Sequence, residues 1–436
     1  MVNHKVTYLF SKENNFGLKL NKFLEMRNSS NVDIEKNVLD IINQVNIHGD
    51  RALITMINKH DKIKCSNLEN IKIENKLLKK AFDDLPIDLK NAMKLASNRI
   101  KAFHEKQKLS GFDYVDEIGV NLGLKYSPIK RVGFYTPGGK ALYPSSVLMN
   151  AIPALVAGVE ERVLVSPINI EKSSEILLAA AYLAEVTEFY RMGGAQAIAA
   201  LAFGTKKLKK VDKIVGPGNS YVAEAKRQLF GKVGIDSVAG PSEVLIVADK
   251  INKPEWIALD LLSQAEHDEN AQSILITNDK KFGELVEDNI TKLLETLPRK
   301  KIASSSWYKN GLIIIVEHIE ECIDIINQIA PEHLELCIEN PKLYLNDIKN
   351  AGSIFLGNYT PEAIGDYIAG PNHVLPTGGT ARFSSGLGTN DFLRRTTFVQ
   401  CNEHNLNELG KYAEILADAE GLDAHRMSIN SRRKHD

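Results

Sequence analysis

Short apolar runs alternate with stretches of helical spacing through most of this chain. The first series of apolar runs occupies positions 132–135, 162–165, 188–192 and 213–215, and helical stretches begin near 145, 173, 194 and 220. A second series of apolar runs follows at 244–247, 273–277, 312–316, 334–338 and 353–356. Because parallel strands are usually connected by helices, this order predicts an α/β fold with two parallel sheets covered by helices.

Helical patterns without intervening strands flank these two series. Residues 31–107 carry apolar stripes, one of which includes Val38, Ile42 and Val45. The portion from about residue 391 onward shows a similar stripe through Leu409 and Tyr412. This periodicity predicts amphipathic helices toward both ends of the chain, each with one face to bury.

Composition narrows the class of protein. The 436 residues include 54 Lys and Arg against 55 Asp and Glu, so no general positive charge attracts a nucleic acid. No apolar stretch reaches the about 18 residues of a membrane helix, and the first residues lack the apolar core of a signal peptide. The four cysteines have no C-x-x-C spacing, which favours free thiols in a reducing compartment. We therefore expect a cytoplasmic protein with no nucleic-acid or membrane partner.

Glycine, proline, asparagine and serine are concentrated in residues 365–393, a composition that disfavours a regular helix or strand. Apolar side chains recur through the segment, and its only charges are Asp366, Arg382 and Asp391, which is unlike a disordered chain. We therefore predict a long ordered loop, and such loops usually carry function.

Glycine-rich turns follow three of the first four predicted strands. They are Pro137-Gly-Gly139, Gly193-Gly-Ala-Gln196 and Gly216-Pro-Gly-Asn219. Open α/β sheets bind ligands at the carboxyl ends of their strands, where helix N-termini offer free N–H groups to anions. None of the turns reads G-x-G-x-x-G, and a glycine there can simply permit a positive φ. Three such turns, with Tyr135, Gln196 and Asn219 beside them, favour a dinucleotide site.

Gln264 and His267 lie three residues apart near the end of a predicted helix. This spacing places both side chains on one helix face, where they could bind one ion. A helix cap or a solvated surface pair explains the same spacing. No cysteine lies nearby, which excludes a thiolate zinc site, whereas nitrogen and oxygen ligands suit a catalytic Zn, Mn or Fe ion.

Further combinations of acid and histidine occur toward the C-terminus. Glu332 and His333 lie in a loop that enters a predicted strand, so both can reach one cavity as water activator and base, or else face solvent. Asp366 and His373 are separated by a Gly-Pro break, so only a folded loop brings them together. His425 lies near a basic tail, which taken alone favours the surface.

Taken in order along the chain, these motifs resemble those of the histidinol dehydrogenase family. The matching segments, between about residues 132 and 425, are GFYTPGG, YPSSVLMNAIPA, GGAQAIAALAFGT, VDKIVGPGNSYVAEAKRQLFG, AGPSEVLIVAD, SQAEHD, APEHLEL, GDYIAGPNHVLPT and EGLDAH. The resemblance implies a homodimer with two incomplete Rossmann-like domains, a small N-terminal segment and a helical C-terminal tail that reaches the other subunit's active site. It also implies the oxidation of L-histidinol through L-histidinal to L-histidine, by NAD and water, at the end of histidine biosynthesis.

The resemblance further implies a role for individual residues. It places zinc on Gln264, His267, Asp366 and His425, the last supplied by the other subunit, and NAD near Tyr135, Gln196 and Asn219. Substrate contacts fall to Ser242, His373 and Glu420, together with the metal ligands and the catalytic pair. That pair is His333 as general acid and base, and Glu332 as the group that activates water.

Four segments follow from this comparison of motifs. They are an N-terminal segment 1–28, a discontinuous α/β domain 29–131 with 246–386 that carries the metal and catalytic residues, an NAD-binding domain 132–245, and a tail 387–436 exchanged between subunits. An alternative is an NAD-dependent enzyme of the same fold that oxidises another polar alcohol, although Glu420 would repel a sulfonated one. A zinc hydrolase would not need the three glycine turns, and a binding protein would not need Glu332 beside His333.

Overall fold

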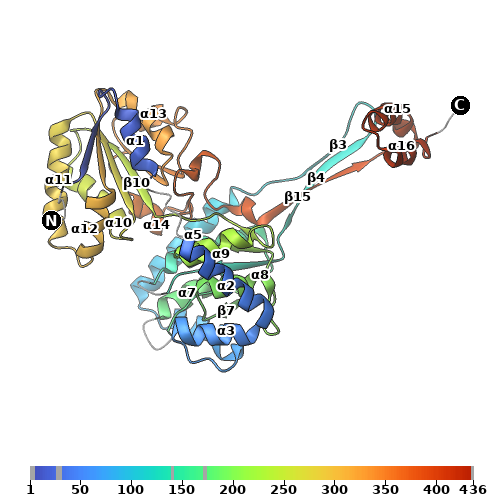
Figure 1. Ribbon diagram of the computed structural model, residues 1–436, viewed down its shortest axis with the longest axis horizontal. Coiled ribbons are helices and arrows are strands. Elements are labelled where there is room, and N and C mark those ends of the chain that lie inside the picture. Colours follow the sequence, from blue (N-terminus) through green and yellow to red (C-terminus); the bar gives the residue numbers. More distant parts are fainter. Residues whose placement is uncertain (1–4, 26–31, 139–141, 170–173, 434–436) are drawn as a thin grey trace.

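The computed structural model describes residues 5–25, 32–138, 142–169 and 174–433. Two six-stranded sheets with helices on their faces form the body, and a three-stranded sheet extends from it as an arm that ends in two helices (Figure 1). The predicted α/β class is confirmed. Within the described ranges, no helix combines the length and the apolar character needed to cross a membrane. The four cysteines are free thiols, as predicted.

The first sheet has the strand order β2-β7-β6-β5-β8-β9 and is parallel except for the edge strand β2. Its strands are β2 (Lys72–Ile73), β5 (Arg131–Tyr135), β6 (Glu161–Val165), β7 (Glu188–Tyr190), β8 (Lys213–Val215) and β9 (Gly234–Ile235). Helices α6 (Pro144–Ala157), α7 (Glu175–Leu183), α8 (Gly194–Phe203) and α9 (Ser220–Leu229) connect them. Every residue of β5 is buried, as expected for a parallel strand covered on both faces. Gly139, in the first predicted glycine turn, lies outside the described residues.

The N-terminal helices pack on this first sheet. They are α2 (Val32–His48), α3 (Asp50–Met56), the π-helix Ile57–Asp61, α4 (Asn75–Asp83) and α5 (Ile87–Glu105). Helix α2 contacts α8 and α9, whereas α4 contacts α7 and α5 contacts α6. This packing differs from the expected grouping of 29–131 with 246–386. Since α7 and α8 are apolar on almost every side, they need an outer layer, and the amphipathic N-terminal helices supply it.

The second sheet is entirely parallel, with the order β1-β12-β11-β10-β13-β14. Its strands are β1 (Thr7–Phe10), β10 (Glu243–Ala248), β11 (Gln272–Thr277), β12 (Leu312–Ile315), β13 (His333–Cys337) and β14 (Ser353–Leu356). Its helices are α1 (Phe16–Glu25), α10 (Pro254–Ala265), α11 (Lys280–Leu294), α12 (Lys300–Asn310), α13 (Cys322–Ile329) and α14 (Glu362–Tyr367). The N-terminal segment therefore supplies the edge strand β1 of this sheet.

The arm is an antiparallel sheet of β3 (Phe112–Val115), β4 (Asn121–Pro128) and β15 (Leu393–Gln400). The prediction of helix from about residue 391 is wrong for β15, whose Thr-Thr-Phe-Val residues favour a strand once β4 offers an edge. Helices α15 (Glu403–Ala419) and α16 (Asp423–Asn430) confirm the helical end. Figure 1 shows both helices at the tip of the arm, away from the two large sheets.

The glycine-rich segment 365–393 is a folded loop through most of its length. Its first residues complete α14, and short 3-10 turns lie at Thr380–Arg382 and Thr389–Phe392. Leu387 and Phe392 are buried and belong to the core of the first sheet. The loop is therefore ordered, as predicted, and lies between the two large sheets.

Candidate active site

The candidate site lies at the amino ends of strands in the second sheet. His333 is the first residue of β13, and Ser242 directly precedes β10. Gln264 lies in the last turn of α10, and His267 lies in the turn that follows this helix before β11. Because these strands are parallel neighbours, the residues share one edge of the sheet. This edge differs from the carboxyl ends that carry the glycine turns of the first sheet.

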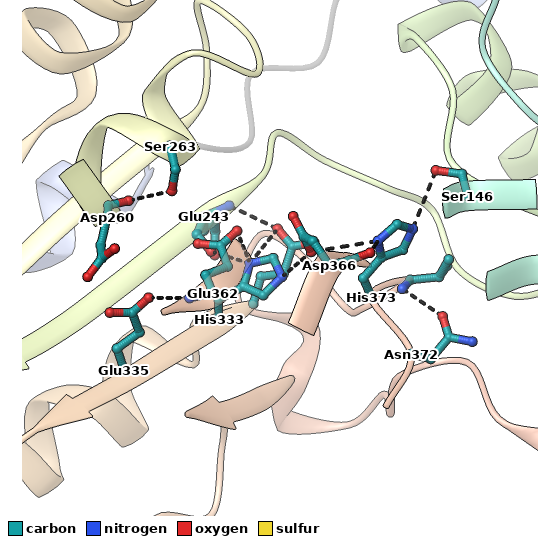
Figure 2. Close-up of polar contacts among 12 residues, drawn as sticks. Ser146, Glu243, Asp260, Ser263, His333, Glu335, Glu362, Asp366, Asn372 and His373 are labelled. Atoms are coloured by element: carbon teal, nitrogen blue, oxygen red, sulfur yellow. Dashed lines mark hydrogen bonds and ion pairs between the residues drawn. The ribbon is translucent and has the colours of Figure 1, made fainter. Parts of the chain in front are cut away.

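His373 connects this edge to the first sheet. Its Nε2 lies 3.4 Å from Oγ of Ser146, which is in the first turn of α6 and therefore beyond the carboxyl end of β5. Its Nδ1 lies 3.1 Å from the backbone oxygen of Asp366 (Figure 2). The amino edge of the second sheet therefore faces the carboxyl edge of the first, and the candidate site lies between them.

The two ring nitrogens of His333 have different surroundings. Nδ1 lies 3.1 Å from the backbone oxygen of Glu243 and 3.3 Å from Oε1 of Glu362. Nε2 is buried and has no hydrogen-bond partner among the described residues. A proton on Nδ1 satisfies the Glu243 carbonyl and leaves the lone pair on Nε2. Burial lowers the pKa of His333 to about 4, so the ring is neutral near pH 7 and can accept a proton.

Glu332 lies beside this histidine. Its Oε2 accepts a hydrogen bond of 2.9 Å from the backbone N–H of Glu243 and lies 3.9 Å from Nδ1 of His333. Burial raises the pKa of Glu332 well above its usual range, and the charges of Glu243 and Asp366 add to this effect. An ionised carboxylate that is destabilised in this way accepts a proton readily. The pair expected to be catalytic is therefore brought together in a buried position.

Three residues fit the requirements of a bound metal ion. Gln264 is 1% exposed, and neither atom of its amide group has a hydrogen-bond partner among the described residues. A buried amide without partners is unfavourable unless it binds something else. His267 and Asp366 lie close enough for their charges to interact. An imidazole nitrogen, an amide oxygen and a carboxylate oxygen form a donor set that suits zinc.

Asp366 is adjacent to two histidines. Its Oδ1 lies 3.6 Å from Nδ1 of His373 and 4.0 Å from Nε2 of His333. Burial raises the pKa of Asp366, but the hydrogen bond and charge of His373 outweigh burial and bring this pKa below its usual value. The carboxyl group is therefore ionised near neutral pH, which is the form that binds a metal.

Sequence reasoning missed Glu362 and Glu243. Glu362 presents an atom within 4.8 Å of ligand atoms of both His333 and Asp366. Burial, followed by the charges of Asp366 and Glu335, raises the pKa of Glu362 well above its usual range. A signal was available, because Glu362 and Asp366 are four residues apart on α14. For Glu243 no local signal exists, since it meets Glu332 only through the pairing of β10 with β13.

Tyr135 is the last residue of β5, Gln196 lies in the first turn of α8 after β7, and Asn219 directly precedes α9 after β8. The Tyr135 hydroxyl accepts a hydrogen bond of 3.2 Å from the N–H of Gly194. Gln196 is buried, with its Nε2 3.4 Å from Oδ2 of Asp61. Asn219 caps α9, since its Oδ1 accepts two hydrogen bonds of 3.1 Å from the first turn of that helix. Each residue therefore has an internal contact as well as a position at the expected edge.

Known proteins match both the sequence and this fold. The sequence profile of the histidinol dehydrogenase family matches residues 24–433. The chain belongs to the histidinol dehydrogenase family. A histidinol dehydrogenase from Nitrosomonas europaea is 50% identical over 428 residues, which cover 98% of this chain and 99% of that protein. One from Rhodospirillum rubrum is 52% identical over 401 residues, 92% of each protein. The crystal structure of histidinol dehydrogenase from Elizabethkingia anophelis has 36% identity and a TM-score of 0.91, with 98% of each chain covered.

Two residues that the family resemblance assigns to the site lie elsewhere in this single chain. Glu420 follows α15 and His425 is in α16, and both side chains are exposed. Figure 1 shows α15 and α16 at the tip of the arm, far from α10 and α14, which carry Gln264 and Asp366. Within a single chain, Glu420 and His425 therefore do not lie near the other site residues.

Proposed function

We propose that the protein oxidises L-histidinol through L-histidinal to L-histidine, with two NAD and one water as co-substrates. The observation that carries this proposal is the buried pair of Glu332 and His333 at the same sheet edge as Gln264, whose amide has no hydrogen-bond partner among the described residues. Oxidation of an alcohol to a carboxylate requires a base for its proton transfers and a group that delivers water to the aldehyde. In a chain of this family, the pair supplies both groups.

His333 is proposed to take the hydroxyl proton on Nε2, while Nδ1–H stays hydrogen-bonded to the Glu243 carbonyl. His333 then loses this proton to solvent, Glu332 orients water toward the aldehyde and accepts one of its protons, and the neutral His333 accepts the hydroxyl proton of the hydrate. NAD, when bound, accepts the two hydrides. The reaction balances as one alcohol, one water and two NAD giving one carboxylate, two NADH and three protons.

Gln264, His267 and Asp366 are the proposed zinc ligands, with His425 of the partner subunit as the fourth. Bound zinc would supply open coordination positions for the amino and imidazole nitrogens of the substrate. His373 lies beside Asp366, and both His373 and Ser242 remain proposed substrate contacts. The exposed side of His267 leaves room for the groups that would complete the site.

Tyr135, Gln196 and Asn219 are the proposed NAD contacts. They lie at the carboxyl edge of the first sheet, which faces the amino edge of the second through the contact of His373 with Ser146. A cofactor bound along the first edge would therefore have one end toward His333. NAD use agrees with the family, and the three residue assignments are part of the proposal.

We also propose a homodimer in which the arms are exchanged. The arm exposes large apolar side chains that a second chain could cover, namely Phe112, Tyr114, Val115, Val399, Tyr412, Ile415 and Leu416. Exchange would bring the Glu420 carboxylate to the ammonium group of the substrate in the other subunit.

A mixture of Asp366→Ala and His425→Ala variants tests this arrangement. Random reassortment should restore about one quarter of the activity, because half of the dimers carry one intact site. No recovery would place His425 in the site of its own chain.

The ratio of NADH formed to L-histidinol consumed tests the proposed reaction. We expect two NADH per substrate, and one NADH with free aldehyde would refute the four-electron mechanism. A polar alcohol without imidazole, tested in parallel, would be preferred if the same-fold alternative were right. A hydrolase would produce no NADH. The cytoplasmic location stays a prediction.

A further inference from the structure

Three elements carry the proposed site, and two further carboxyl groups lie where these elements meet. Gln264 is on α10, His333 is on β13 and Asp366 is on α14. Asp260 and Glu335 lie behind them, and Figure 2 shows their carboxyl groups facing one another. The proton transfers proposed above use neither residue.

Glu335 makes contacts to two of the other elements. It is fully buried on β13, and its Oε1 accepts a hydrogen bond of 2.7 Å from the backbone N–H of Glu362, the first residue of α14. Figure 2 shows its carboxyl group beside that of Asp260 on α10, and each of the two groups shifts the pKa of the other. Glu335 therefore links the strand that carries His333 to both helices.

The spacing along each element ties this link to the site. Asp260 and Gln264 are four residues apart on α10 and therefore share a face. His333 and Glu335 are two apart on β13 and therefore point to the same side of the sheet. The bonded N–H of Glu362 lies one helical turn before Asp366 on α14. If either carboxyl group were displaced, a site residue one helical turn or two strand residues away would therefore be displaced as well.

Two adjacent carboxyl groups can form a hydrogen bond only when one of them is protonated, because an ionised carboxylate only accepts hydrogen bonds. Burial raises the pKa of Asp260 to about 6, and burial together with the charge of Asp260 raises the pKa of Glu335 well above its usual range. One proton shared by the pair avoids two adjacent buried charges. The pair then carries one negative charge and one donor.

We propose that Asp260 and Glu335 form a proton-sharing carboxyl pair that positions Gln264, His333 and Asp366 relative to one another. Both are positioning residues, since neither touches the proposed substrate. The inference rests on the proposed function, through the metal and catalytic roles given above. The experiments below distinguish a failure of the carboxyl pair from a failure of that function.

Amide and leucine variants distinguish a shared proton from simple filling of space. Either Glu335→Gln or Asp260→Asn leaves the pair with one negative charge and one N–H donor. Either Glu335→Leu or Asp260→Leu removes the hydrogen bond between the two side chains. We expect the amide variants to stay within about 3-fold of the wild-type zinc dissociation constant. The leucine variants should weaken zinc binding about 10- to 100-fold, the usual effect of losing a group that orients metal ligands. The measurement is competition for zinc between the metal-free protein and a chromophoric chelator.

Hydrogen exchange provides a readout that needs neither metal nor substrate. We expect the amides of residues 362–367 to exchange faster in Glu335→Leu than in Glu335→Gln or the wild type. Ser273→Ala is the matched control, because the buried Ser273 hydroxyl donates 2.8 Å to the Leu261 carbonyl and also ties α10 to the sheet. This control should lower stability without changing zinc affinity.

Specific results would overturn the inference. Leucine variants with wild-type zinc affinity and wild-type exchange would show that the pair positions nothing. Amide variants as impaired as the leucine variants would refute the shared proton. If Glu335→Leu does not fold, Asp260→Leu, at a partly exposed position, provides the same comparison. A wild-type protein that failed to oxidise L-histidinol would refute the proposed function, whereas the exchange result would still decide on the pair.

Discussion

Replacing Lys226 with Met should destabilise the unit built on the first sheet. Lys226 and Asp236 form an ion pair in which the side chains are only 2% and 6% exposed. The Lys226 Nζ donates 3.0 Å to the carbonyl of Gly216, and Asp236 Oδ2 accepts 2.7 Å from the N–H of the same glycine. The pair therefore holds both backbone groups of the residue that begins the Gly216–Asn219 turn, where we propose that NAD binds.

The size of the effect follows from burial. Met removes the charge of Lys226 and leaves Asp236 buried without a counter-ion, which typically costs about 3–5 kcal/mol. For a folding unit of roughly 200 residues, each kcal/mol lowers Tm by about 2–4 °C, so we expect a fall of roughly 6–20 °C. Arg227 is the matched control, since its side chain is 51% exposed and pairs with Glu224 at 2.7 Å. Losing such a surface pair costs about 0–1 kcal/mol.

Thermal unfolding and NAD kinetics together provide the assay. Lys226→Met should lower Tm strongly and raise the KM for NAD, because the turn that carries Asn219 loses its support. Arg227→Met should change neither appreciably. The double variant Lys226→Met with Asp236→Leu should regain part of the lost stability, because no buried charge remains unpaired. Equal falls in Tm for the two single variants, or no recovery in the double variant, would refute this reasoning.

Three further predictions concern the site and the pH dependence of stability. Glu332→Gln should slow oxidation of L-histidinal more than that of L-histidinol in separate half-reaction assays, and equal slowing would contradict its role with water. Chelation should abolish turnover while circular dichroism stays unchanged, because the proposed ligands lie on α10, α14 and the arm; activity that survives chelation would contradict the metal assignment. Burial raises the pKa of Glu188, but hydrogen bonds from Arg131 and Tyr190 outweigh it, and the pKa falls from 4.5 to about 2. The stability contributed by Glu188 is therefore complete above about pH 4.5 and lost as the pH falls toward 2, so Glu188→Gln should flatten the acid limb of a stability–pH curve. An unchanged slope would show that the ion pair contributes nothing.

The two series of strands could be predicted because parallel strands are buried on both faces. Strands such as β10 and β11 then need apolar residues at nearly every position, and such runs are visible without knowledge of their neighbours. The arm lacked this signal. Strand β3 is exposed throughout, and β15 is exposed at seven of its eight positions, so neither shows the pattern of a strand with a buried face.

The amphipathic stripes of the N-terminal helices predicted helices but not the surface on which they pack. A stripe specifies that one face is buried, and any apolar surface satisfies it. The packing of α2 on α8 and of α4 on α7 depends on which helices lack an outer layer, and this is known only when the sheets have formed.

The sequence by itself determined the family and the residue types of the site, since Glu332, His333 and Asp366 lie in short motifs whose chemistry depends on side-chain identity. The tertiary structure decided which of these residues meet. Glu243 reaches Glu332 through strand pairing, and His373 reaches Ser146 across the two sheets. Such contacts join segments far apart in the chain, and their partners are set by register and packing. The spacing of residues along the chain encodes neither the register nor the packing.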